Sequence, residues 1–271
     1  MRTPPPSGPT VSAQAAPLAT ALPPALLTAL RELSALPYEN LSKIVAHSLG
    51  GNLESTLGLA ADWLEKSRDT GAGGTCFSLT WWLRERLRAA GLDGALLMGD
   101  KGKAANIHCA LRFDWLGRSY LLDPGYMIFD PLPLPEAGLS AMAWVSPNEV
   151  RVEDIPTQGV WRLWSGPRGA LKQRFDFRRA AVSEAEFLAH WEASYALPMM
   201  GYPVLNRIRD GTQYYLQKRG LLIRTAEGGQ MRKLDRTELL STLQATFGIP
   251  ESLAKEAIGV VLSRDPDFFR K

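Results

Sequence analysis

The sequence predicts an α+β protein: an N-terminal helical bundle, a central set of antiparallel strands and a C-terminal α/β region. Before Gly91, apolar residues recur at the spacing of helices. After Gly91 the apolar and aromatic runs become short and are separated by glycine and aspartate, which is typical of strands. Near the C-terminus, helix start and stop signals return. Helices, then strands, then a mixed tail indicate an α+β architecture.

Composition limits the classes of function. The chain has 271 residues, of which 45% are hydrophobic, so it is long enough for a large core divided into two or three parts. A net charge of +3 without a basic stripe argues against a nucleic-acid partner. Two cysteines and three histidines form neither a disulfide framework nor a zinc cluster. We therefore expect a soluble, cytoplasmic protein with no metal, no membrane partner and no permanently bound cofactor.

We expect four segments along the chain. Residues 1–20 are rich in Pro, Ala, Ser and Thr and lack the continuous apolar core of a signal peptide, so they are predicted to form a disordered arm. Residues 21–91 are predicted to be the helical domain. Strands should dominate residues 92–197, and residues 198–271 should form the C-terminal α/β region.

Three helices are expected in the helical domain, at residues 24–36, 57–66 and 76–90. In the third, Phe77, Leu83 and Leu87 can face a core, whereas Arg84 and its charged neighbours are expected in solvent.

Eight segments are predicted to be strands, and one helix is expected at 183–195. Two further helices are expected at the C-terminal end of the chain. Asp235 followed by Glu238 predicts a helix start with a capping box, and Gly248 predicts its end. The strand segments, which indicate an antiparallel barrel or a sandwich, are GALLMGD, NIHCALRFDW, RSYLLDPGY, EVRVED, GVWRLWSG, LKQRFDFRR, TQYYLQKRG and LLIRTAEGG.

Cys76 lies where a glycine-rich loop, GAGGT, becomes a helix. At a helix N-terminus the dipole and the unpaired backbone N–H groups stabilise a thiolate, so the pKa of such a thiol falls below about 8.5. The glycines let the backbone turn tightly and let a substrate approach closely. The alternative for an isolated cysteine is a buried, inert apolar residue.

His108 and Asp123 are candidate partners of this thiol. They lie on consecutive strand segments joined by a short loop near Trp115. A loop of two or four residues puts the two side chains on one face, because side-chain direction alternates along a strand, whereas a three-residue loop separates them. Asp123 would then orient His108, which would hold Cys76 as a thiolate that attacks an acyl carbon. By the same alternation, Cys109 points to the opposite face and is expected to serve packing.

The sequence around these residues resembles the arylamine N-acetyltransferase family, which includes related amide synthases. GGTCFSL is similar to the family's Gly-Gly-x-Cys-Phe active-site motif, and LPYENLSKI is similar to its Pro-Phe-Glu-Asn-Leu segment. NIHCALRF and SYLLDPGY resemble its histidine and Asp-x-Gly-aromatic strands. Further collinear matches, from Leu26 to Ile249 overall, are PLPL, RFDF, DGTQYYL and LLSTLQATFGI.

The resemblance implies a helical bundle, a β-barrel and a C-terminal α/β lid region, with a Cys-His-Asp triad of the papain and transglutaminase type. It implies ping-pong chemistry, in which Cys76 takes an acyl group from acetyl-CoA or another acyl thioester and passes it to an arylamine or hydrazine. By position, Tyr38 and Tyr126 match aromatic residues of the family's acceptor pocket.

The chain departs from the family's pattern near the cysteine. Ala72 stands where the family has arginine, Thr75 where it has an aromatic residue, and Ser78 and Thr80 where it has Glu and Asn. Pro124 also alters the Asp-Val-Gly-Phe-Gly segment and removes a backbone donor.

These departures keep other functions open. One is an amide synthase that takes its acyl chain from a carrier protein, and another is a hydrolase or transglutaminase-like enzyme with the same triad. A third is a binding or scaffold protein with a relic site.

Overall fold

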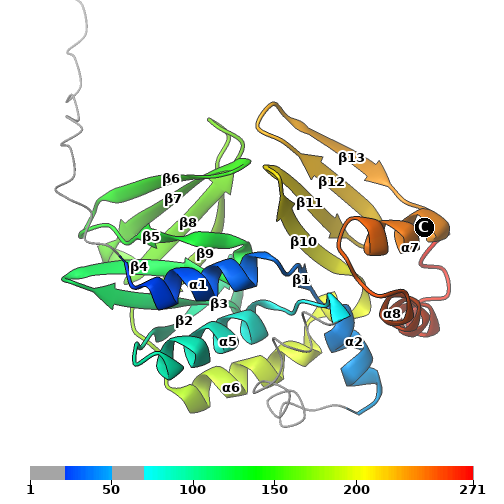
Figure 1. Ribbon diagram of the computed structural model, residues 1–271, viewed down its shortest axis with the longest axis horizontal. Helices are drawn as coiled ribbons and strands as arrows, with labels where there is room; N and C mark the ends of the chain where they lie inside the picture. The colour runs from blue at the N-terminus through cyan, green and yellow to red at the C-terminus, as the bar shows by residue number, and fades with distance from the viewer. Residues whose placement is uncertain (1–21, 51–69, 271) are drawn as a thin grey trace, which may run out of the picture.

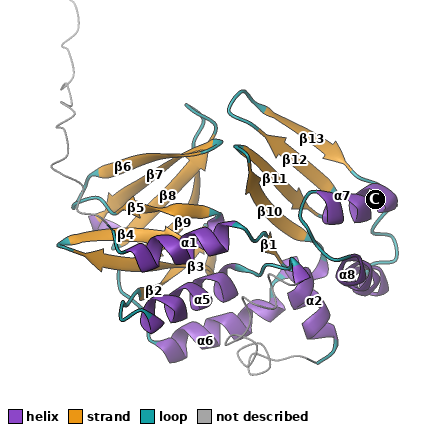
Figure 2. Ribbon diagram, viewed as in Figure 1, coloured by secondary structure: helices purple, strands orange, loops and turns teal. Residues whose placement is uncertain are grey.

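The computed structural model describes residues 22–50 and 70–270 (Figure 1). The predicted arm at 1–20 and the predicted helix at 57–66 lie outside these residues. Within the described ranges, helices and strands are both abundant, and the α+β prediction is confirmed (Figure 2).

Three helices pack as one layer against the first sheet. They are α1 (Pro24–Ser34), α5 (Cys76–Ala89) and α6 (Glu184–Ala193). In the view of Figure 1, α5 and α6 lie below the sheet. Their apolar faces share one core with one face of β3, and the rings of Phe77 and Phe187 lie 5.4 Å apart in it. Burial of these large side chains is the main force that holds the layer on the sheet.

The first sheet has eight antiparallel strands in the order β5-β4-β3-β2-β9-β8-β7-β6. Its two end strands, β5 and β6, contact each other, so the sheet is a nearly closed barrel. The strands are β2 (Ala95–Lys101), β3 (Ala104–Trp115), β4 (Arg118–Asp123), β5 (Ile128–Pro133), β6 (Ser140–Val145), β7 (Asn148–Ile155), β8 (Val160–Gly166) and β9 (Lys172–Arg178).

The second sheet has the order β1-β10-β11-β12-β13 and packs against helices α2, α7 and α8. Its first strand comes from the N-terminal part of the chain: Tyr38 pairs with Asn206, and Glu39 pairs with Leu205. The elements are β1 (Tyr38–Glu39), α2 (Leu41–Ser48), β10 (Val204–Arg209), β11 (Thr212–Gln217), β12 (Gly220–Arg224), β13 (Gly229–Lys233), α7 (Arg236–Ala245) and α8 (Glu251–Arg264).

Short 3-10 helices connect several of these elements. The one that matters for the site is η1 (Pro124–Tyr126), which follows β4 directly. The others are η2 (Pro156–Gln158), η3 (Ser194–Ala196) and η4 (Pro198–Gly201).

Several local predictions are confirmed. The capping box of α7 forms between Asp235 and Glu238, and the chain turns at Gly248 with φ of +76°. One prediction is wrong: Arg84 is buried rather than solvated, because α6 brings Glu184 to within 3.0 Å of its guanidinium. Strands β1, β5, β6, β10 and β13 and helix α2 were not expected from the sequence. No helix of residues 22–50 and 70–270 has the length and apolar character needed to cross a membrane.

Asn40 joins the N-terminal segment to the second sheet. It is fully buried, and its side-chain amide donates to the carbonyl oxygens of Met199 (2.7 Å) and Tyr202 (3.0 Å). The side-chain oxygen of Asn40, Oδ1, accepts a hydrogen bond from the backbone N–H of Val204 at 2.8 Å. One side chain thereby satisfies three backbone groups at the entry to β10 and fixes the position of β1 beside it.

We expect Asn40→Ala to lower the free energy of unfolding by about 3 kcal/mol, because it leaves buried backbone groups without partners. Urea denaturation would measure the change. Gln230→Ala, at an exposed position of β13, is the control and should change stability by less than ~0.5 kcal/mol. Equal stability of the two variants would contradict this role of Asn40.

Candidate active site

Cys76 is the first residue of α5, as predicted. The residue before it, Thr75, is extended and its side chain does not cap the helix, so the first backbone N–H groups lack that partner. The glycine loop before Cys76 packs against the chain itself, since a Cβ on Gly73 would lie 1.6 Å from the carbonyl oxygen of Pro37. Gly74 accepts a hydrogen bond from Glu39 N at 3.0 Å. The glycines therefore let the loop pass closely against β1.

His108 and Asp123 share a face, as the two-residue loop requires. Trp115 pairs with Arg118, which leaves Leu116 and Gly117 as the turn, with φ of +47° and +76°. Positive φ at both positions is the hairpin geometry that matches strand twist. His108 Nε2 lies 2.9 Å from each carboxylate oxygen of Asp123. Asp123 is fully buried, and it also accepts a hydrogen bond from the backbone N–H of Tyr126 at 2.9 Å.

Gly125 brings these two residues up to the helix. It lies in η1, and a Cβ at this position would be 2.5 Å from Cys76 Cβ and 3.2 Å from His108 Cε1. Only a residue without a side chain permits this approach. The N-terminus of α5, the imidazole and the turn after β4 therefore meet at one point.

The environment of this point favours charge separation. Burial alone would lower the pKa of His108, but the charge and hydrogen bond of Asp123, together with contact with Cys76, raise it to about 10. A hydrogen bond with the Cys109 thiol lowers the pKa of Cys76, whereas burial raises it. His108 and the charge of Lys43 lower it further, and the pKa of Cys76 falls well below its usual range. Both shifts act in the direction of a thiolate on Cys76 and an imidazolium on His108.

Cys109 packs as predicted but has one contact that the sequence does not reveal. It is fully buried, and its Sγ lies 3.6 Å from the hydroxyl of Thr80 on α5. Strand alternation correctly turns it away from His108. However, α5 crosses that face of β3, so the thiol of Cys109 also reaches Cys76.

Lys43 of α2 is a further neighbour that sequence reasoning missed. Burial lowers its pKa to about 8, and its ammonium lies 4.2 Å from the centre of the Tyr195 ring. The positive charge is close enough to Cys76 to favour the thiolate. Its sequence context, a polar position in a short helix, carries no signal of this role.

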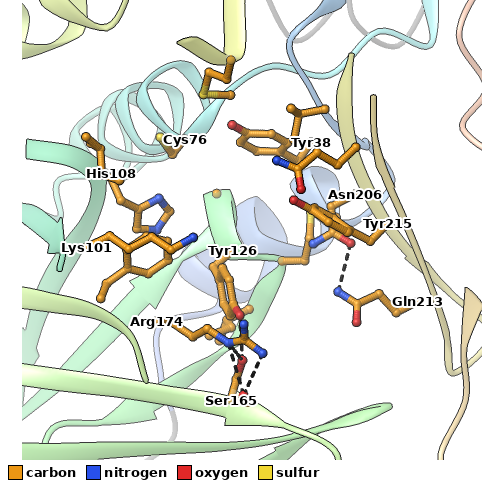
Figure 3. A pocket seen from close by; sticks show the side chains of 18 of the residues that line it. Tyr38, Cys76, Lys101, His108, Tyr126, Ser165, Arg174, Asn206, Gln213 and Tyr215 are labelled. Atoms are coloured by element: carbon orange, nitrogen blue, oxygen red, sulfur yellow. Dashed lines mark hydrogen bonds between the residues drawn. The ribbon is translucent and has the colours of Figure 1, made fainter. Parts of the chain in front are cut away.

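A cavity of about 650 Å³ opens beside the thiol, between the barrel and the second sheet. Cys76 and His108 line it, and so do both predicted pocket residues, Tyr38 from β1 and Tyr126 from η1 (Figure 3). Asp123 lies behind His108 and outside the lining. The residues described contain no group of three or more His, Cys, Asp or Glu side chains arranged to hold a metal ion.

Phe175 of β9 holds the imidazole from the side of the barrel. Its ring stacks on that of His108 with a centroid distance of 4.0 Å and an angle of 12° between the planes. Tyr126 meets His108 edge-on at 6.3 Å. Phe175 belongs to the RFDF segment, one of the matches to the family's sequence. Its contact with His108 cannot be predicted from the sequence, because it depends on β9 lying beside β2, and these strands are far apart in the chain.

Solved structures provide the comparison with known proteins. The chain is similar to the arylamine N-acetyltransferase of Nocardia farcinica, with a TM-score of 0.72, 20% identity and coverage of 91% of this chain and 87% of that one. The Mycobacterium marinum enzyme in complex with CoA matches with a TM-score of 0.70 and 20% identity over 86% of this chain and 91% of that one.

The enzyme from Salmonella typhimurium matches with a TM-score of 0.68 and 18% identity, over 87% of this chain and 89% of that one. No protein-family model matches the chain, and no curated protein matches it significantly. The likeness extends over almost the whole of both chains in each structural pair, so it concerns the complete arrangement of helices and sheets. The chain has the fold of the arylamine N-acetyltransferases, as its sequence resemblance implies.

Proposed function

We propose that this protein is an N-acyltransferase that moves an acyl group from a thioester to an amine through a thioester on Cys76. The observation that carries the proposal is that Cys76 and His108 meet at Gly125, where a Cβ would lie 2.5 Å from Cys76 Cβ and 3.2 Å from His108 Cε1. His108 Nε2 in turn lies 2.9 Å from both oxygens of Asp123. The similar solved enzymes are arylamine N-acetyltransferases, one of them in complex with CoA. They support acetyl-CoA as the donor and an arylamine or hydrazine as the acceptor.

In the first half-reaction the Cys76 thiolate attacks the carbonyl carbon of the donor thioester. The new S–C bond forms, the donor's S–C bond breaks, and the His108 imidazolium gives its proton to the departing thiol. The positive end of α5 favours the negative charge that develops on the carbonyl oxygen. Asp123 keeps the imidazole oriented throughout.

In the second half-reaction the amine nitrogen attacks the Cys76 thioester. A C–N bond forms, the C–S bond breaks, and His108 takes the proton that the amine loses. The enzyme returns to its thiolate–imidazolium state. Tyr38 and Tyr126, which line the cavity beside the thiol, are proposed to hold the ring of the acceptor.

The size of the cavity favours a second candidate within the same chemistry. About 650 Å³ lies within the range of pockets that enclose drug-sized ligands. An amide synthase that releases or cyclises a longer acyl chain from CoA or a carrier protein would use the same three residues. A hydrolase would differ only in its acceptor, because water would replace the amine.

Brief incubation with acetyl-CoA, propionyl-CoA or a long-chain thioester should add the mass of one acyl group to the protein. Intact mass spectrometry measures this adduct. It should be absent in Cys76→Ala and disappear from the wild type when an arylamine is added. Cys109→Ala should still form it. A protein that gains no acyl group from any donor would contradict the proposal, and release of free acid without an amine would indicate the hydrolase.

Alkylation of Cys76 by iodoacetamide should depend little on pH between about 6 and 9, whereas a free thiol loses reactivity below about 8.5. The lowered thiol pKa keeps the thiolate as pH falls, and the raised His108 pKa of about 10 keeps the imidazolium as pH rises.

Asp123→Asn removes the charge that raises the His108 pKa. The thiolate should then form at higher pH, and the alkylation rate at pH 6.5 should fall by about tenfold or more. Asp130→Asn, at an exposed position on β5, is the control. Identical pH profiles for both variants would refute the role of Asp123.

Gly125→Ala should reduce the rate of Cys76 acylation by at least about 100-fold, because the new methyl group must displace the thiol or η1. Stopped-flow or quench measurements of acyl-enzyme formation report the rate, and circular dichroism checks the fold. Gly201→Ala is the control, since its Cβ would meet no atom within 4 Å. A fully active Gly125→Ala enzyme would show that this close approach is not needed.

A further inference from the structure

The two cysteines of the chain meet between α5 and β3. Cys76 begins α5, Cys109 lies on β3, and both are buried free thiols. Their side chains share a hydrogen bond. A buried cysteine packs as a small apolar residue, and alanine or valine would fill the same space. A second thiol in contact with the first adds a chemistry that those residues lack.

Thr80 fixes the position of Cys109 against α5. Its hydroxyl lies 3.6 Å from Cys109 Sγ and donates to the carbonyl oxygen of Cys109 at 3.4 Å. Thr80 follows Cys76 by four residues, so the two side chains lie on the same face of the helix, one turn apart. The thiol of Cys109 is therefore held beside the first turn of α5, where Cys76 lies.

The two thiols differ in their access to small molecules. Cys76 lines the cavity, whereas Cys109 is fully buried and does not belong to the lining. A small reagent that enters the cavity therefore meets Cys76 first. Cys109 is reached from the cavity through Cys76.

The two thiols also differ in their protonation. The hydrogen bond with Cys109, together with His108, lowers the pKa of Cys76. Burial raises the pKa of Cys109, and the hydrogen bond and charge of Cys76 raise it further. Cys76 is thus the thiolate of the pair, and thiolates are the species that peroxides oxidise. Oxidation of Cys76 removes a negative charge that helps to keep the proton on Cys109.

We propose that Cys109 is a resolving cysteine, which forms a disulfide with Cys76 after a hydroperoxide has oxidised Cys76 to a sulfenic acid. The disulfide would switch the enzyme off reversibly, because it occupies the sulfur that carries the acyl group. This regulatory consequence rests on the proposed function, whereas formation of the disulfide does not.

The first step oxidises Cys76. Its thiolate sulfur attacks one oxygen of the hydroperoxide, an S–O bond forms and the O–O bond breaks. The departing oxygen takes a proton from the His108 imidazolium. Cys76 becomes a sulfenic acid, and the hydroperoxide is reduced to water or an alcohol.

The second step joins the two cysteines. Cys109 sulfur attacks Cys76 sulfur, the S–S bond forms and the S–O bond breaks. The hydroxide that leaves combines with the proton of the Cys109 thiol to form water. The two cysteines have then supplied the two electrons that reduced one hydroperoxide. A dithiol restores both thiols by exchange, and it reaches the disulfide at Cys76 from the cavity.

The position of Cys76 suits this bond. A disulfide needs its sulfur atoms about 2.05 Å apart, closer than two hydrogen-bonded thiols. Cys76 is the first residue of α5, and the side chain of Thr75 does not cap the helix there. The approach therefore involves the end of the helix rather than its middle. Rapid closure would also protect Cys76, since a sulfenic acid that is not resolved oxidises further to a sulfinic acid, which thiols do not reduce.

The test treats the wild-type protein with a small excess of hydrogen peroxide. Free thiols are then blocked with N-ethylmaleimide in denaturant, and the intact mass is measured. We expect a monomer that has lost two hydrogen atoms and carries no maleimide. Because the chain has two cysteines, an internal disulfide in it must join Cys76 to Cys109. Dithiothreitol before the blocking step should restore two maleimide adducts.

Cys109→Ala is the comparison, with Cys109→Ser as a second variant and circular dichroism as the check on folding. In both variants peroxide should add oxygen atoms to Cys76. Acylation is measured relative to the untreated form of each protein. Treated wild type should lose about tenfold or more and recover with dithiothreitol, whereas the treated variants should not recover.

Two results would overturn the proposal. One is a wild-type protein that gains oxygen atoms on Cys76 as readily as Cys109→Ala. The other is oxidation that yields only disulfides between two copies of the chain. A protein that forms the internal disulfide but accepts no acyl group from any donor would support the role of Cys109 and refute the proposed transferase, so the two failures are distinguishable.

Discussion

The structure depends on one buried carboxylate. Asp123 is fully buried, and an ion in such a place costs several kcal/mol unless opposite charge and hydrogen bonds compensate it. His108 supplies both in two 2.9 Å contacts, and the backbone N–H of Tyr126 supplies a third. The Cys109 thiol and His108 both lower the pKa of the Cys76 thiol, against the effect of its burial. Three residues from a helix, a strand and a strand end are therefore coupled through charge.

This coupling explains local features that would otherwise be costly. The chain leaves β4 at Asp123 and turns at once into η1, where Pro124 occupies the first position and needs no N–H partner. Met127 then takes a left-handed conformation with φ of +61° to enter β5. The turn carries Gly125 against α5, and no side chain fits in that gap.

The second sheet supplies one wall of the cavity that Cys76 and His108 line. Strand β1 crosses from the N-terminal segment to pair with β10, and Asn40 fixes the crossing. The same crossing places Tyr38 in the cavity. One wall of the cavity therefore comes from β1, β10, β11 and β12, and the opposite wall comes from the barrel.

The sequence predicts what depends on neighbouring residues. The start of α5 at Cys76 follows from a glycine loop and helical spacing, and the shared face of His108 and Asp123 follows from a two-residue turn. It does not predict β1, because two residues become a strand only when Asn206 and Leu205 come to pair with them. The burial of Arg84 depends in the same way on Glu184, which a distant helix supplies.

Two arginines that line the cavity show the same limit. Arg174 and Arg224 lie on strands of different sheets, and nothing in either local sequence indicates that they face one space. Phe175 likewise reaches His108 only because β9 inserts beside β2. The hydrophobic periodicity of a local segment does not predict which side chains meet across two sheets.

The departures from the family's motif near Cys76 lie outside the cavity lining. Ala72, Thr75, Ser78 and Thr80 surround the start of α5, and none of them lines the cavity. Ser78 donates to the carbonyl oxygen of Thr75, and Thr80 contacts Cys109, so these positions support the helix and the back of the thiol.

Under the proposed function, the choice of substrate depends on the residues that line the cavity. Tyr38, Tyr126 and Phe175 give the cavity lining aromatic surface, and Arg174 and Arg224 give it positive charge. An apolar wall discriminates weakly among rings of similar size, whereas oriented charges left without a partner penalise a neutral ligand strongly. If the site acts as proposed, the arginines are therefore expected to affect specificity more than the changed residues around Cys76.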